Sequence, residues 1–205
     1  MSFKTFKNNL LNNPLPFNIV RSILLAGKGK MYKELRNTIA PEKGSKVLDV
    51  GCGTGEFALL FDNSVDYTGI DMNTGFLDYA STLYKNQNKK FSQMDATKMS
   101  FKKSEFDTSL LLSFIHHFSE EDLDKILREV NRITKKSIFV LEPIPRKYNL
   151  LSKLFYALDR GDFIRNKEEQ LRILNKYFTV DSYKEFKSGL YTLSIIRCSP
   201  KALKE

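Results

Sequence analysis

The stretch that decides the fold is Val47-Leu48-Asp49-Val50-Gly51-Cys52-Gly53-Thr54-Gly55-Glu56-Phe57. Its apolar start predicts a buried strand that runs directly into three closely spaced glycines. Glycine has no Cβ, so the main chain can approach a ligand there, and the helix expected next presents unpaired N–H groups. Asp71 ends the following apolar run about twenty residues on, which suits a ribose diol. Together these features predict a nucleoside-cofactor site.

The spacing of the glycines bears on which cofactor the loop binds. It is Gly-x-Gly-x-Gly and not the Gly-x-Gly-x-x-Gly of dinucleotide binding, and Glu56 stands where that pattern has its third glycine. A pyrophosphate would meet a like charge at Glu56. S-adenosylmethionine carries no phosphate, and its ammonium and sulfonium are cations that Asp49, Glu56 and Asp71 can offset. The loop therefore favours S-adenosylmethionine.

With these residues the chain resembles the class I S-adenosylmethionine-dependent methyltransferases, whose first motif matches residues 47–57. Residues 91–96 resemble the end of that family's third strand. Residues 105–118 resemble the fourth strand and its turn, with an apolar-His-His-apolar step similar to many small-molecule, type 11-like members. The resemblance covers residues 30–145, and it departs from the pattern at residues 132–137, which lack the glycine usual before the fifth strand.

The resemblance implies a set of cofactor-binding residues at the carboxyl ends of the strands. Asp71 is expected to bind the ribose and Asp95 to face the adenine amino group. The alternatives are a helix-capping carboxylate for Asp71 and an Asx-type turn for Asp95. The full predicted set is Asp49, Gly51, Cys52, Gly53, Thr54, Gly55, Asp71, Met72, Asp95, Ala96 and Ser113.

Apolar spacing predicts strands that alternate with helices, which implies a parallel sheet covered on both faces. The expected strands are 46–50, 66–70, 90–94, 106–112, 137–142, 177–186 and 191–197. The expected helices are 17–25, 31–39, 54–62, 74–86, 119–133, 148–158 and 167–176, with Ser119 as the N-cap of the fifth of these. The predicted fold class is α/β: a Rossmann-like, doubly wound, seven-stranded, mostly parallel sheet with an antiparallel C-terminal strand, N-terminal lid helices and a small helical cap after the fifth strand.

We expect one methyltransferase domain over residues 1–205. Its predicted parts are lid helices (1–45), a cofactor-binding core (46–142), a helical cap (143–176) and closing strands (177–205).

The composition favours a soluble, cytoplasmic protein. Its two cysteines form no disulfide framework. The longest apolar stretches, such as residues 138–141, fall far short of the roughly 20 residues of a spanning helix, and the N-terminus has no signal-peptide core. The net charge is +9, but the lysines occur as scattered pairs, which is typical of a solvated surface. A basic functional surface is the alternative.

The two histidines of the chain, His116 and His117, are adjacent and follow the fourth predicted strand. An imidazole can take a proton from a hydroxyl at neutral pH, so both are candidate catalytic residues. The competing interpretation is that one ring packs against the cofactor while the other bonds a backbone group. No cysteine or carboxylate lies near them at metal-ligand spacing, so no metal is predicted.

A polar cluster in the predicted cap, Asp159-Arg160-Gly161-Asp162-Phe163-Ile164-Arg165, is a candidate acceptor contact. Paired arginines suit an acidic or phosphorylated molecule, and a surface turn with Arg–Asp pairs is the alternative. The predicted substrate-binding residues are Glu142, Arg146, Tyr148, Arg160 and Arg165.

The function predicted from these features is methyl transfer from S-adenosylmethionine to a small-molecule acceptor by in-line displacement, with S-adenosylhomocysteine as product. The paired arginines favour an acidic acceptor. A nucleic-acid methyltransferase is the alternative. It is disfavoured because residues 113–116 read Ser-Phe-Ile-His where enzymes acting on a flipped amino base often have Asn/Asp-Pro-Pro-aromatic. A non-catalytic S-adenosylmethionine-binding module is the alternative from another class. The sequence leaves the oligomeric state and the acceptor open.

Overall fold

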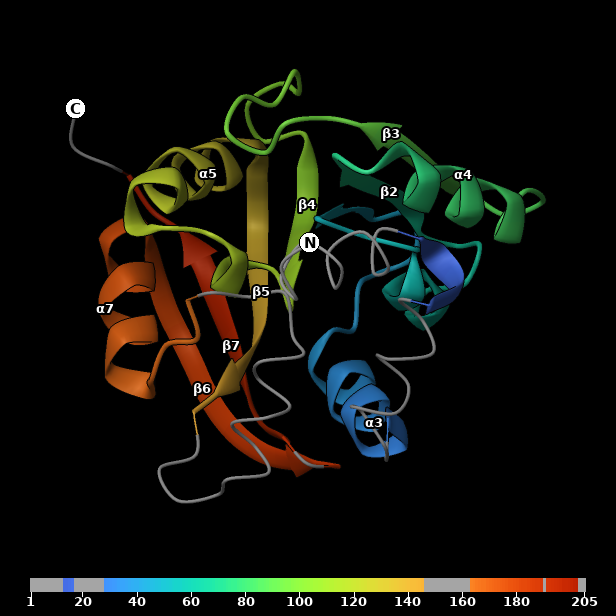
Figure 1. Ribbon diagram of the computed structural model, residues 1–205. Helices are drawn as coiled ribbons and strands as arrows, with labels where there is room; N and C mark the ends of the chain where they lie inside the picture. Colours follow the sequence, from blue (N-terminus) through green and yellow to red (C-terminus); the bar gives the residue numbers. More distant parts are fainter. Residues whose placement is uncertain (1–12, 17–27, 146–162, 190, 203–205) are drawn as a thin grey trace, which may run out of the picture.

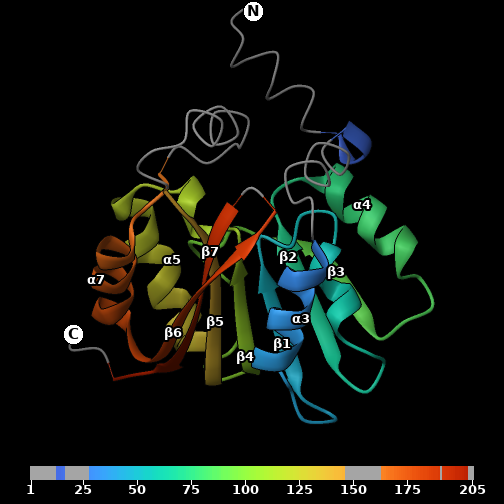
Figure 2. The same ribbon diagram turned by 90° about the horizontal axis from the view of Figure 1, so that it is seen from below.

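The computed structural model describes residues 13–16, 28–145, 163–189 and 191–202. These contain a seven-stranded sheet in the order β3-β2-β1-β4-β5-β7-β6. Figure 2 shows this order across the molecule, from β3 at one edge to β6 at the other. The strands are β1 (Lys46–Val50), β2 (Asp66–Asp71), β3 (Lys89–Gln93), β4 (Phe106–Leu112), β5 (Thr134–Ile144), β6 (Phe178–Ser188) and β7 (Tyr191–Pro200).

α-Helices and short 3₁₀ turns of the described residues join and cover these strands. They are α3 (Lys28–Thr38), η1 (Glu56–Leu60), α4 (Thr74–Leu83), η2 (Ile115–His117), α5 (Glu120–Ile133) and α7 (Lys167–Tyr177). Figure 1 shows α4 beside β2 and β3, and α5 and α7 together near the opposite edge. Within the described part of the chain, no helix is both long and apolar enough to cross a bilayer.

The pairing of the strands confirms the predicted doubly wound sheet. Strands β1 to β5 are joined by parallel pairings, whereas β7 runs antiparallel to both β5 and β6. The chain leaves β1 toward β2 and β3, then returns to place β4 on the other side of β1. In open α/β sheets ligands bind outside the carboxyl ends of the strands at such a reversal of order. The β1–β4 junction is therefore the place to look for a site.

Side chains that alternate along the strands divide the core into two faces. Leu48, Leu111 and Val140 belong to the face covered by α5 and α7. Val47 and Leu110 belong to the opposite face, where α3 and η1 pack. Both faces of the central strands are buried, which explains why these strands read as nearly continuous apolar runs.

The segment after the glycines differs from the prediction. An α-helix was expected over 54–62, but the structure has only the 3₁₀ turn η1, preceded by Gly55 in the left-handed conformation at φ 74°. The turn is closed by i to i+3 bonds from Ala58 N to Gly55 O and from Phe61 N to Ala58 O. Residues 61–65 follow as a bend and a turn that lead into β2.

Two predicted outer helices are part of the core. Residues 31–39 were expected in a lid, but α3 buries Met31 and Leu35 against the sheet. Residues 167–176 were expected in a cap, but α7 buries Ile173 and Leu174 in the opposite face. Two further predicted helices, 17–25 and 148–158, lie outside the described residues.

The turn before the fifth strand needs no glycine. Helix α5 ends at Ile133 and β5 begins at Thr134 without a loop between them, and Thr134 N donates to Val130 O. At the other end of the helix Ser119 accepts from Asp122 N, which confirms the predicted N-cap.

Candidate active site

Three glycines with positive φ shape the loop after β1. Gly51, Gly53 and Gly55 have φ angles of 72°, 55° and 74°, a region that side chains with a Cβ rarely occupy. The amides of Gly51 and Cys52 both donate to the carbonyl of Ile70, at 2.8 and 3.0 Å. The loop thus folds back over the carboxyl end of β2.

The outer two glycines also allow close contacts. A Cβ on Gly51 would lie 2.1 Å from Cδ2 of Phe114, and one on Gly55 would lie 3.0 Å from the Cβ of Ala80. A Cβ on Gly53 would meet no described atom within 4 Å. Gly51 and Gly55 are therefore required for packing within the protein, whereas Gly53 leaves space beside the main chain.

Asp71 is fixed at the end of β2 by two backbone amides. Its Oδ2 accepts from Gly53 N at 2.9 Å and its Oδ1 accepts from Asn73 N at 2.8 Å. Each carboxylate oxygen has a second lone pair for a ligand hydroxyl. The next residue, Met72, is 60% exposed, so an apolar side chain stands beside the carboxylate.

Asp49 lies beneath the loop and is 1% exposed. Its Oδ2 accepts from the Tyr67 hydroxyl at 2.6 Å. Burial, followed by the nearby Asp49 charge, raises the pKa of Tyr67 well above its usual range. Burial also raises the pKa of the Cys52 thiol, with Asp49 and Asp71 acting in the same direction. Cys52 is thus a protonated, buried thiol within the loop, and Thr54 is likewise buried.

Glu56 has a different role from the one expected. Its Oε1 accepts from Lys28 Nζ at 2.6 Å and from the Tyr32 hydroxyl at 2.7 Å, and its side chain is 10% exposed. Because Lys28 offsets its charge, Glu56 repels a phosphate less than the sequence suggests. The contact joins the first turns of α3 to the glycine loop.

The residues expected near the adenine lie along the same edge of the sheet. Oδ1 of Asp95 accepts from the Thr97 amide and hydroxyl, both at 2.8 Å. These two hydrogen bonds, that from the amide first, lower the pKa of Asp95. This is the Asx-type turn that was the alternative for Asp95, and the carboxylate remains exposed next to half-buried Ala96. Met94 N donates to Asp71 O at 3.2 Å, which ties the two segments together.

The turn after β4 begins with Ser113, whose φ of 55° is unusual for a residue with a side chain. Ser113 N donates to Leu141 O at 2.7 Å and so stays attached to β5. His116 and His117 follow in η2, with ring centroids 4.2 Å apart. His116 is 3% exposed and its Nδ1 lies 2.6 Å from Oε2 of Glu142, whereas His117 is only half-buried.

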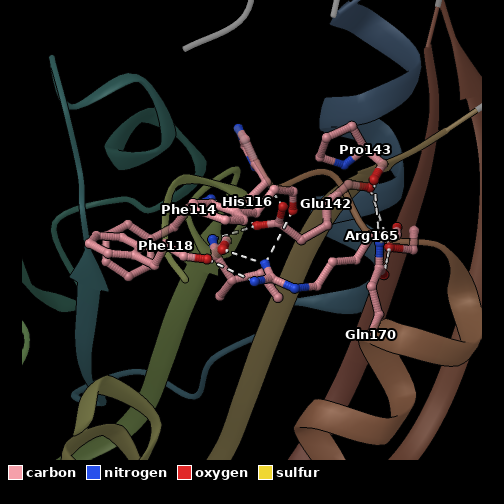
Figure 3. A network of polar contacts seen from close by, with 10 residues as sticks. Phe114, His116, Phe118, Glu142, Pro143, Arg165 and Gln170 are labelled. Carbon is pink, nitrogen blue, oxygen red and sulfur yellow. Dashed lines mark hydrogen bonds and ion pairs between the residues drawn. The ribbon is translucent and has the colours of Figure 1, made fainter. Parts of the chain in front are cut away.

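The predicted acceptor contacts of Glu142 and Arg165 conflict with their positions. Glu142 is 1% exposed and Arg165 is 8% exposed, and both bond to the η2 turn, as Figure 3 shows. Burial lowers the pKa of the Arg165 guanidinium, while Glu142 and Glu120 act in the opposite direction. Both side chains are engaged within the protein. The other predicted acceptor residues, Arg146, Tyr148 and Arg160, lie outside the described residues.

Several supporting residues were not predicted from the sequence. Phe114 packs on Gly51, Tyr67 bonds Asp49, and Lys28 pairs with Glu56. Of these, only the contact of Tyr67 could have been predicted. Once β1 and β2 are taken to pair in parallel, residues 49 and 67 lie on one face of the sheet. In the described part of the chain, no group of three His, Cys, Asp or Glu side chains is arranged to hold a metal ion.

Comparison with known proteins finds similarity to methyltransferases. A family model described as a methyltransferase domain matches residues 47–137, which run from the glycine loop to the start of β5. The matched residues lie within the region 30–145, in which the sequence resembles class I S-adenosylmethionine-dependent methyltransferases. The resemblance predicted from the motifs is therefore confirmed.

Relatives of this chain include a demethylmenaquinone methyltransferase of Bacteroides fragilis. The two are 28% identical over 160 residues, which cover 70% of this chain and 61% of the relative, so the match spans less than two thirds of that protein. Two solved structures share the fold. An S-adenosylmethionine-dependent methyltransferase of Methanosarcina mazei has a TM-score of 0.68 at 21% identity, over 80% of this chain and 95% of the other. Magnesium protoporphyrin IX methyltransferase of Synechocystis PCC 6803, with bound S-adenosylhomocysteine, has a TM-score of 0.67 at 15% identity, over 92% and 88%.

Proposed function

We propose that this protein is a methyltransferase that transfers a methyl group from S-adenosylmethionine to a small-molecule acceptor. One observation carries the proposal: the Gly53 amide and the Asp71 carboxylate are bonded to each other where the sheet order reverses. The main chain at Gly53, which has no side chain, therefore lies beside a carboxylate that can accept a hydrogen bond from a ligand hydroxyl. The match to a methyltransferase family model over residues 47–137 supports the same cofactor.

The residues present fit a sulfonium nucleoside. The space beside Gly53 admits a ligand against the main chain, Asp71 can accept from a ribose diol, and exposed Met72 offers an apolar surface for an adenine ring. Asp95 and Ala96 would contact the adenine, and Ser113 would contact the methionine part of the cofactor. When bound, the cofactor supplies an electrophilic methyl group for in-line displacement. The protein's contribution is to hold the acceptor in line and exclude water.

Asp49, Cys52 and Thr54 support the loop from below. The Asp49 carboxylate is buried under the glycines and the Cys52 thiol is held protonated, so neither acts as a nucleophile toward the methyl group. Their side chains keep the loop in the conformation that leaves Gly53 open.

For an acceptor that must lose a proton, we propose His117 as the base and not His116. His117 is partly exposed beside the β4 end, while His116 is almost fully buried and bonded to Glu142. Turnover of His117→Gln and His116→Gln, measured alongside S-adenosylhomocysteine affinity, tests this choice. A His117→Gln variant with full turnover would exclude proton removal by this ring.

Relatives guide the choice of acceptor. A demethylmenaquinone methyltransferase is among them, so reduced demethylmenaquinone with a short prenyl tail is the first acceptor to assay. An acidic acceptor stays a prediction that rests on Arg146, Tyr148 and Arg160, because Arg165 is engaged elsewhere. One domain over residues 1–205 and a cytoplasmic location also stay predictions, the second based on two free cysteines.

Titration calorimetry with S-adenosylmethionine, S-adenosylhomocysteine and NAD separates the candidate functions. A methyltransferase binds the first two and not the third, and a ligand that binds the folded state also raises the melting temperature. Folded protein that gives no heat with either sulfur compound would refute the proposal. Binding without turnover on any acceptor in a broad panel would favour the non-catalytic module. Filter binding of RNA and DNA at two salt concentrations tests the nucleic-acid alternative, because phosphate contacts weaken steeply with salt.

A further inference from the structure

The η2 turn carries both histidines but has few bonds of its own. It comprises three residues, and a 3₁₀ turn this short leaves amides at its start and carbonyls at its end without partners inside the turn. Two buried, charged side chains from distant elements meet these groups (Figure 3). One comes from β5 and the other from the segment before α7.

Glu142 holds the start of the turn. Its Oε1 accepts from both Phe114 N and Ile115 N at 2.8 Å, and its Oε2 lies 2.6 Å from Nδ1 of His116. Both amides donate to Oε1, and an ionised carboxylate accepts on its second oxygen as well, so we assign the proton between Oε2 and the ring to Nδ1. The same side chain therefore fixes the backbone and one tautomer of His116.

Arg165 holds the end of the turn. Its Nη1 donates to Ile115 O at 3.0 Å and its Nη2 donates to Phe118 O at 2.7 Å. The planar guanidinium can reach two carbonyls at once, which a lysine ammonium cannot do with the same geometry. The Arg165 carbonyl in turn accepts from Gln170 Nε2 at 2.9 Å, so this contact is anchored on α7.

The turn also touches the glycine loop. The ring of Phe114, whose amide is bonded to Glu142, lies so close to Gly51 that no Cβ would fit between them. The position of the histidine pair is thereby set relative to the loop that the proposed function assigns to the cofactor.

We propose that Glu142 and Arg165 are positioning residues of the methyl-transfer site. Glu142 fixes the Nδ1–H tautomer of His116, and Arg165 keeps the turn in place, so that the neighbouring His117 ring stands at the carboxyl end of β4 beside the glycine loop. Neither side chain contacts the acceptor. The inference rests on the proposed function for the role of the ring pair, but its geometry can be tested without any acceptor.

Glu142→Gln is the sharpest variant for the tautomer. Its carbonyl oxygen can still accept from the two amides, but its NH₂ group then faces His116 and donates to Nδ1, so the ring proton must move to Nε2. Long-range ¹H–¹⁵N NMR of the rings reports the tautomer directly, and the chain has only 2 histidines to assign. We expect Nδ1–H in the wild type and Nε2–H in Glu142→Gln. The same tautomer in both proteins would overturn the role of Glu142.

Arg165→Lys tests the other end of the turn and keeps the proposal falsifiable should Glu142→Gln not fold. A lysine cannot keep both bonds that Arg165 makes to Ile115 O and Phe118 O, so opening of the turn costs less free energy. Loss of one charge-assisted bond should therefore speed up hydrogen exchange of the Phe114 and Ile115 amides by about tenfold or more. S-adenosylhomocysteine should shift the histidine ring signals strongly in the wild type and weakly in this variant. Unchanged exchange and unchanged ring shifts would overturn the role of Arg165.

Two matched variants serve as controls. Glu129 on α5 also accepts a backbone amide, from Met99 at 2.8 Å, and pairs with an arginine, but it lies away from η2. Arg172 on α7 is half exposed and pairs with Glu120. Glu129→Gln and Arg172→Lys are expected to keep the wild-type tautomer, exchange rates and ligand-induced shifts; an equal change in either control would show that the readouts are not specific to the turn and would overturn the proposal.

The outcomes separate this inference from the proposed function. Wild-type protein that binds S-adenosylhomocysteine but has the His116 proton on Nε2 overturns the positioning role and leaves the function standing. Wild-type protein that binds no S-adenosylhomocysteine refutes the function, while the tautomer and exchange measurements still decide whether Glu142 and Arg165 hold the turn.

Discussion

The glycine loop after β1 and the η2 turn after β4 lie in contact where the sheet order reverses, yet different interactions hold them. The loop is shaped by three positive-φ glycines and by bonds from neighbouring backbone and Asp71. The turn is held by Glu142 and Arg165, which lie 27 and 50 residues away from Ile115 along the chain. The comparison teaches that a local motif can encode one side of the proposed site, while its opposite side depends on distant charged residues.

Gly51→Ala, in the glycine loop, should have the largest effect on stability. The left-handed conformation costs a residue with a Cβ about 1–2 kcal/mol, and overlap with Phe114 adds about 1–3 kcal/mol. We expect the free energy of unfolding to fall by about 2–5 kcal/mol in urea denaturation. Gly53→Ala is the matched control, since φ is also positive there but no described atom lies within 4 Å of the added Cβ, so only the first cost applies.

The double variant Gly51→Ala with Phe114→Ala checks the cause. If the overlap matters, the two changes are strongly non-additive, since removing the ring relieves the alanine. Additive losses would show that Phe114 and Gly51 do not contact each other in solution.

Asp71→Asn should weaken cofactor binding without unfolding the protein. An amide keeps one acceptor oxygen for the Gly53 or Asn73 amide but loses the charge-assisted bonds, each worth about 1.5–3 kcal/mol. Calorimetry should show S-adenosylhomocysteine affinity reduced by about 10–100-fold. Asp66→Asn, at the other end of β2, is the control and should bind normally. Equal affinities for Asp71→Asn and the wild type would contradict the ribose assignment.

Alkaline pH should destabilise the folded protein, because thiol and phenol groups are buried in it. Burial raises the pKa of Cys52 and Tyr67, and it raises that of Cys198 to about 12. In the unfolded chain thiols ionise near about 8.5 and tyrosines near about 10, so above these values the unfolded state binds fewer protons than the native state. Stability is therefore complete below about pH 8.5 and falls as pH rises, by at most about 1.4 kcal/mol per pH unit per group.

Urea unfolding from about pH 8 to about pH 10.5 measures this loss. Cys198→Ala removes one of the ionising groups and should give a shallower dependence on pH. A free energy of unfolding that stays constant over the range would show that these side chains are accessible to solvent in the native state.

Ser119→Ala should have the smallest effect. Ser119 caps α5 directly after η2, and loss of such a cap costs about 1 kcal/mol. Because Glu142 and Arg165 hold η2 independently of this cap, exchange of the Phe114 and Ile115 amides relative to global unfolding should stay at the wild-type level. Selective loss of their protection would mean that the turn depends on the helix cap.

The sequence predicted the parts of the molecule that local patterns encode. Alternating apolar runs indicated the seven strands, and the glycines with Asp71 indicated the loop, because strand burial and positive φ leave direct traces in residue type. The sequence did not predict how Glu142 and Arg165 are used. Their roles depend on strand register and on the path of the chain before α7, and nothing in the residues around either one records the contact with η2.

The position of β7 has a consequence for how the polypeptide folds as it is synthesised. This strand lies between β5 and β6, although both precede it in the chain. A nascent chain that has emerged through β6 therefore exposes an unpaired edge of β5, and such edges recruit other strands. We expect ribosome-bound intermediates halted at this length to require a holding chaperone, and to lose that requirement once residues 191–200 can enter the gap.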